Sequence, residues 1–159
     1  MDIKNIQKEI NRIDWKSFSG PEHYEPDRVS GALSSLISLK KESLSDKVYN
    51  NVLFAIGNNH AGTYYPAAQK ALKYIIQTAI TGNTEIAKNC ALNMLIDLYA
   101  SFYPEIGNYN LVTNEELEQK VLNIIEASKE NFNNFLNNEL ESSRNRKLVK
   151  ELLDYIAEK

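Results

Sequence analysis

The segment Asn58-Asn59-His60-Ala61-Gly62-Thr63-Tyr64-Tyr65-Pro66-Ala67 separates two strongly apolar segments near the middle of the 159-residue chain. Gly57 and Gly62 permit backbone conformations that other residues adopt only at a cost. Pro66 has the fixed φ angle that is favoured at the first position of a helix. The segment therefore predicts a defined turn between two packed helices.

Apolar residues recur at helical spacing on both sides of this turn. Residues 45–56 form one amphipathic pattern, which Gly57 ends. The next two patterns run over residues 66–81 and from Thr84 to the residues before Pro104, and their apolar faces are too broad for a surface helix. We expect these two helices to form the centre of the molecule.

The same periodicity continues to both ends of the chain. It predicts further helices over residues 2–13, 27–39, 113–136 and 142–157, giving about seven in all. Because no alternating strand of five or more residues is evident, the sequence predicts an all-α fold. From residue 27 onward the helices form three antiparallel pairs of about 40 residues each, the unit size of a HEAT or armadillo α-α superhelix. A compact helical bundle is the alternative.

Composition sets further limits on the class of protein. The hydrophobic fraction of 43%, the charged fraction of 25% and the net charge of −3 are typical of one globular domain spanning residues 1–159. No apolar segment approaches the ~20 residues of a membrane span. Residues 1–9 carry charges where a signal peptide is apolar, so we expect a cytoplasmic protein with no membrane partner. Cys90 is the single cysteine and is expected in the core.

Alternating helices place the long loops over residues 14–27, 57–65 and 104–113 at one end, and those near 40–44, 81–83 and 137–141 at the other. The first set carries both histidines, several aromatic residues and five carboxylates against Lys16 alone. Such a surface suits a basic protein partner, because aromatic anchors dominate interface energies and carboxylates pair with Lys or Arg. The predicted partner-binding residues are Glu22, His23, Tyr24, Glu25, Asp27, His60, Tyr64, Glu105 and Tyr109.

Motifs of known chemistry are absent from the sequence. It has neither the His-Glu-x-x-His pattern of zinc proteases nor a glycine-rich phosphate loop. We therefore expect no catalytic residues, no metal and no cofactor, and predict a binding protein that is not an enzyme. One alternative stays open: His23 and His60 could meet at the shared end as an acid and base pair.

The pattern His60-x-Gly62-Thr63-x-Tyr65, between the helix containing Val52, Leu53 and Ile56 and a following apolar helix, resembles the inter-helix turn of a group of bacterial HEAT-like helical proteins. The resemblance covers residues 15–100. Small acidic helical proteins of this kind are similar to immunity proteins of contact-dependent or polymorphic toxin systems. The resemblance implies an immunity protein, or antitoxin, whose partner is a cognate toxin, a basic nuclease domain being the expected kind.

A HEAT-like adaptor is the alternative from another class. It would scaffold a complex, or bind nucleic acid through the basic stretch of Arg144, Arg146, Lys147 and Lys150. These cations alternate with Glu141, Glu151 and Asp154, which favours a solvated helix face. With an acidic net charge as well, nucleic acid is not the expected partner.

Overall fold

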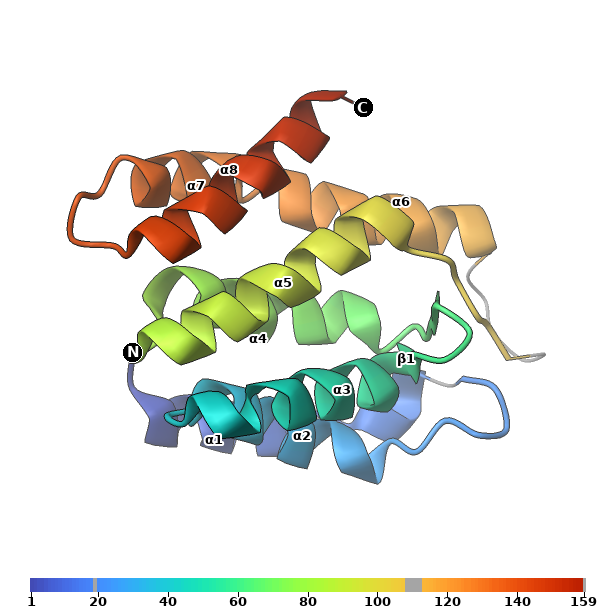
Figure 1. Ribbon diagram of the computed structural model, residues 1–159. Coiled ribbons are helices and arrows are strands. Elements are labelled where there is room, and N and C mark those ends of the chain that lie inside the picture. The colour runs from blue at the N-terminus through green and yellow to red at the C-terminus, as the bar shows by residue number, and fades with distance from the viewer. Residues whose placement is uncertain (19, 108–112, 159) are drawn as a thin grey trace.

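A computed structural model describes residues 1–18, 20–107 and 113–158, and it confirms the all-α fold (Figure 1). Short 3-10 helices at Trp15–Phe18 and Glu42–Leu44 and a two-stranded hairpin accompany the α-helices. The elements are α1 (Ile3–Asn11), α2 (Asp27–Ile37), α3 (Ser45–Ile56), β1 (Gly57–Asn58), β2 (Thr63–Tyr64), α4 (Ala68–Thr81), α5 (Glu85–Ser101), α6 (Asn114–Glu126), α7 (Lys129–Leu136) and α8 (Ser143–Glu158).

Side-chain caps fix the start of several helices. Thr84 accepts a hydrogen bond from the backbone nitrogen of Ala87 at 3.0 Å, which satisfies one of the free donors at the start of α5. Thr113 and Glu116 form a capping box before α6, because the side chain of each accepts from the backbone nitrogen of the other. The expected starts of these two helices are thereby confirmed.

The predicted helix over residues 113–136 is wrong in one respect, because it is two helices. α6 ends at Glu126 and α7 begins at Lys129. Ser128 has ψ 4°, and its backbone nitrogen donates to the oxygen of Ile125, in a tighter turn than that of an α-helix. The break redirects the chain so that Phe132 and Phe135 are buried, at 0% and 5% exposure.

The helices form two layers. The first layer contains α1, α2, α4, α6 and α7: α1 packs on α2, α2 on α4, and α4 on α6 and α7. The second layer contains α3, α5 and α8, and α3 and α8 pack on the two sides of α5. Between the layers α2 packs on α3, α4 on α5, and α7 on α8. Figure 1 shows these three pairs side by side, with α5 at the centre of the nearer layer. α4 and α5 are central, as predicted.

The central position of α5 explains its composition. Its neighbours α3, α4, α6 and α8 surround it, so it has apolar residues on almost every side. Leu92, Leu95 and Leu98 are fully buried, and each contributes roughly 1.5–3 kcal/mol relative to an exposed position. Within the described residues, no helix has both the length and the apolar character needed to cross a membrane.

Candidate functional site

Three long connections meet at one end of the molecule, at the right of Figure 1, as the alternation of helices predicts. We call this surface the loop end and define it as residues 12–18, 20–27, 57–67 and 102–107. Glu105 joins all three: one carboxylate oxygen lies 3.0 Å from Nε2 of His23, and the other accepts a hydrogen bond from the Thr63 hydroxyl. Its backbone nitrogen also donates to the oxygen of Tyr64 at 2.7 Å. The three connections therefore form one surface.

The central connection is a β-hairpin. Gly57 and Asn58 pair antiparallel with Tyr64 and Thr63, and Gly62 has a positive φ of 67°. A Cβ atom at Gly57 would overlap the carbonyl oxygen of Thr63, so only glycine fits there. The two glycines thus have separate roles: Gly62 adopts the left-handed backbone conformation of the turn, and Gly57 allows the two strands to approach closely.

Several aromatic residues of the loop end pack internally. Tyr64 is 3% exposed and stacks on Phe102, with ring centroids 5.1 Å apart. Tyr65 is equally buried, and its ring forms T-shaped contacts with the rings of His23 and Tyr24. Burial raises the pKa of Tyr65 to about 12, so it stays neutral at physiological pH.

Two predicted contact residues therefore have a different role. The buried Tyr64 holds the hairpin against the end of α5, because its backbone nitrogen also donates to the oxygen of Tyr103 at 2.8 Å. The half-buried Tyr24 donates its hydroxyl hydrogen to the carbonyl oxygen of Trp15 at 2.8 Å. We exclude Tyr64 from the exposed surface and assign Tyr24 mainly to packing. Tyr109 lies outside the described residues.

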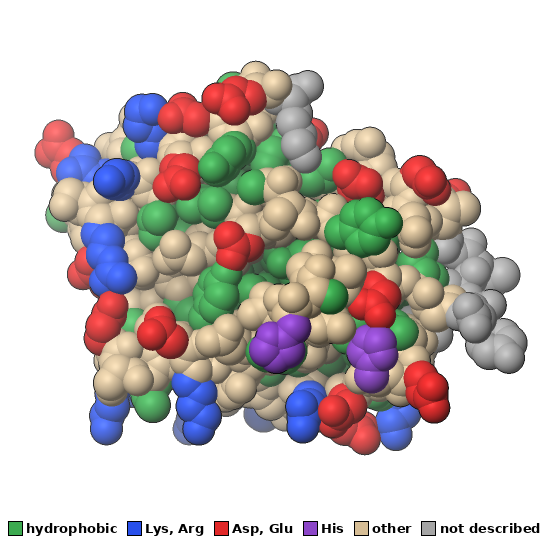
Figure 2. All heavy atoms as spheres, turned by 45° about the vertical axis from the view of Figure 1, so that its right-hand side comes forward, with side chains coloured by type: hydrophobic (Ala, Val, Ile, Leu, Met, Phe, Trp, Pro, Cys, Tyr) green, Lys and Arg blue, Asp and Glu red, His purple; other side chains and the backbone are tan. Residues whose placement is uncertain are grey.

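The exposed part of the loop end consists of other side chains. Glu22, His23, Glu25, Asp27 and His60 are exposed, and Figure 2 shows both histidines on this face among acidic side chains. The ring of His60 packs edge-on against Phe54, with centroids 4.8 Å apart.

Sequence analysis missed two exposed aromatic residues beside these. Tyr103 is 65% exposed and Phe54 is 37% exposed. The sequence does hold a signal for the exposure of Tyr103, because this residue lies between the end of an apolar helix and Pro104, where the backbone leaves the core.

The surface is less acidic than the sequence predicts. Arg28, in the first turn of α2, lies 2.8 Å from Glu25, and Lys16 lies 3.6 Å from Asp27. Lys16 is therefore not the only cation of this surface, because Arg12 lies in the first connection and Arg28, one residue after that connection, pairs with Glu25. Among the described residues, Glu22 takes part in no ion pair.

The groups considered for catalysis have separate environments. His23 contacts Glu105 and Tyr65, whereas His60 contacts Phe54. Cys90 is 2% exposed, and burial raises its pKa to about 11, so the thiol is protonated at neutral pH. The basic stretch of α8 is partly paired, Arg144 with Glu42 and Lys150 with Asp154.

Comparison with known proteins adds no relative: no family model, no curated protein and no solved structure matches this chain. The class that the fold defines is an all-α protein with a surface of three joined connections.

Proposed function

We propose that this chain is an immunity protein that binds and neutralises a cognate bacterial toxin domain through the loop end. The observation that carries the proposal is the position of Glu105, which joins the three connections beside the exposed Tyr103. A ring exposed next to a fixed carboxylate offers a partner both an apolar anchor and a charged contact.

Pre-organisation supports a binding role. Tyr64, Tyr65 and Tyr24 pack beneath the surface, and the hairpin is bonded both to the end of α3 and to the segment that follows α5. A surface already ordered before association loses less conformational entropy on binding than a mobile loop does. The internal aromatic residues thus support the exposed ones.

The chemistry of the surface favours a basic protein partner. Glu22 is exposed and, among the described residues, has no ion pair. Glu25 and Asp27 form ion pairs with Arg28 and Lys16, and the side chains of both pairs are exposed to solvent. Lys or Arg from a partner could replace these weak exposed pairs at little cost, since such pairs contribute about 0–1 kcal/mol. A basic nuclease domain has the matching charge, and the acidic surface disfavours the phosphate backbone of nucleic acid.

The test is direct binding to the toxin domain encoded beside this gene, measured by isothermal titration calorimetry. Tyr103→Ala and Glu22→Lys should each weaken binding by about tenfold, or roughly 1.4 kcal/mol. The matched controls are Tyr155→Ala and Glu118→Lys, on α8 and α6, which should bind like the wild type. Wild-type affinity in both loop-end variants would reject this surface.

A second arm separates the proposal from a nucleic-acid adaptor. The protein is titrated with duplex DNA of mixed sequence at two salt concentrations. Tight binding that falls steeply with salt would contradict the immunity function and favour the adaptor.

A further inference from the structure

A groove crosses the face of the molecule formed by α3, α5 and α8. α3 and α8 pack on opposite sides of α5, so the outer side of α5 is the floor and the other two helices are the walls. The hollow has a volume of about 550 Å³. The side chains that line it include Glu42, Tyr49, Ile96, Asp97, Arg144 and Glu151.

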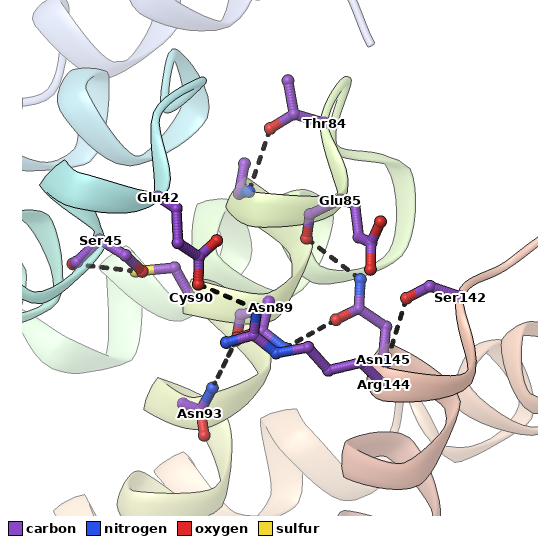
Figure 3. Close-up of polar contacts among 11 residues, drawn as sticks. Glu42, Ser45, Thr84, Glu85, Asn89, Cys90, Asn93, Ser142, Arg144 and Asn145 are labelled. Carbon is purple, nitrogen blue, oxygen red and sulfur yellow. Dashed lines mark hydrogen bonds and ion pairs between the residues drawn. The ribbon is translucent and has the colours of Figure 1, made fainter.

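One end of the groove is closed by an ion pair. Arg144, at the start of α8, lies 2.9 Å from Glu42, which begins the 3-10 helix before α3, and Figure 3 shows the two side chains reaching toward each other. Asn145, the neighbour of Arg144, is bonded to Asn89 on the floor. The closed end therefore lies level with Asn89.

The other end of the groove has carboxylates without a cation. Asp97 follows Asn89 by eight residues on the same helix, which is about 12 Å along its axis. Among the described residues, neither Asp97 nor Glu151 has an ion pair, and Arg144 is the one cation in the lining. Asp97 is half-buried, and this desolvation raises the pKa of its carboxyl group.

The groove also has one apolar side chain on its floor, on α5, and one on its α3 wall. Ile96 is 9% exposed and Tyr49 is partly buried, and both line the groove. Figure 2 shows hydrophobic side chains at the surface of this part of the molecule, between acidic ones. The rest of the floor is polar, with Asn89 and Asn93, so the groove combines two apolar side chains with an uncompensated negative charge.

We propose that this groove binds an amphipathic, basic α-helix of a protein partner. Lys or Arg side chains of that helix would lie beside Asp97 and Glu151, and its apolar side chains would cover Ile96 and Tyr49. Charge complementarity selects this occupant, because a cation beside Asp97 supplies the counter-charge that the chain itself does not provide. The distance of about 12 Å corresponds to roughly two turns of a bound helix.

This inference is independent of the loop end. None of the residues that line the groove belongs to the three connections of that surface. Variants of Asp97 and Glu151 test the groove, and variants of Tyr103 and Glu22 test the loop end, so either proposal can fail alone.

The experiment uses the whole protein and a synthetic 14-residue helical peptide with Lys and Leu on one face. The comparison peptide has Glu in place of each Lys. Binding is followed by backbone amide chemical shifts and by calorimetry. We expect the Lys peptide to shift amides of α3, α5 and α8 and to bind Asp97→Asn and Glu151→Gln about fivefold more weakly, or roughly 1 kcal/mol each.

Glu118→Gln, on α6, is the control and should bind like the wild type. Asp97→Asn and Glu151→Gln preserve side-chain size, and their thermal unfolding shows whether they remain folded. Three results would overturn the proposal: unchanged affinity in both groove variants, equal affinity for the Glu peptide, or shifts confined to the loop end. Binding of spermidine as tight as that of the Lys peptide would also overturn it, since the groove would then recognise charge alone.

Discussion

Asn89 on α5 and Asn145 on α8 form a buried amide pair, in which Nδ2 of Asn89 donates to Oδ1 of Asn145 at 2.8 Å (Figure 3). The two residues are 4% and 0% exposed. Nδ2 of Asn145 donates in turn to the backbone oxygen of Glu85, and Asn93 donates to Oδ1 of Asn89. In each of the two amide groups, both the nitrogen and the oxygen thus take part in a hydrogen bond. These bonds fix the position of α8 on α5.

Removing one member of this pair should destabilise the protein. In Asn145→Ala the amide of Asn89 remains buried without its partner, and we expect the free energy of unfolding in urea to fall by about 1–3 kcal/mol. Asn89→Ala should have a similar effect, and the double variant should lose less than the sum of the two. Asn131→Ala, at an exposed site on α7, is the control. Strict additivity would show that the two residues stabilise the fold independently.

Glu105 should control the order of the loop end more than the stability of the core. Glu105→Ala removes the acceptor of the Thr63 hydroxyl and the partner of His23, whereas Thr63→Val removes the first contact alone. We expect faster amide hydrogen exchange in residues 57–67 and 20–26 for Glu105→Ala, but only in residues 57–67 for Thr63→Val. Unchanged exchange near His23 in Glu105→Ala would mean that packing on Tyr65 suffices to hold that loop.

Two glycines should respond to alanine in opposite directions. Gly31 lies inside α2 and has open space where its Cβ would be, so Gly31→Ala should raise the free energy of unfolding by about 0.4–1 kcal/mol. In Gly57→Ala the new methyl group would meet the Thr63 carbonyl and the Tyr64 ring, so this variant should be destabilised. Chemical denaturation of both variants measures the difference, and equal changes of the same sign would contradict it.

Local signals explain which parts of the fold could be predicted from the sequence. Gly57 ends α3 and Thr84 and Thr113 cap α5 and α6, so these boundaries depend on residues close in the chain. The meeting of the three loops follows from alternation, which needs only the number and order of helices. The break at Ser128 has no such signal, because neither glycine nor proline lies there, and burial of Phe132 and Phe135 decides it.

The site was predicted less completely because exposure depends on distant packing. Tyr64 and Tyr103 are both tyrosines in long connections, yet Tyr64 stacks on Phe102 and Tyr103 faces solvent. Composition could identify the end of the molecule that is rich in aromatic residues, but could not show which rings face outward. The groove was missed for the same reason, since Asp97 and Glu151 are 54 residues apart and line one hollow only because α8 packs on α5.

Asp97 should make the stability of the protein depend on pH in a defined direction. Burial raises the pKa of this carboxyl group in the native state above its ordinary value of 3.8, so the folded protein binds the proton more tightly than the unfolded chain does. The ionised group therefore lowers stability at neutral pH, and this loss disappears as the pH falls through the native pKa to below 3.8. Asp97→Asn should accordingly raise the free energy of unfolding at pH 7, with a gain that shrinks toward zero in acid. Urea denaturation between pH 7 and pH 3, with the exposed Glu139→Gln as the control, measures this gain. A gain that stayed constant over the range would exclude titration of Asp97 as its cause, because both forms of residue 97 are neutral at the acid end.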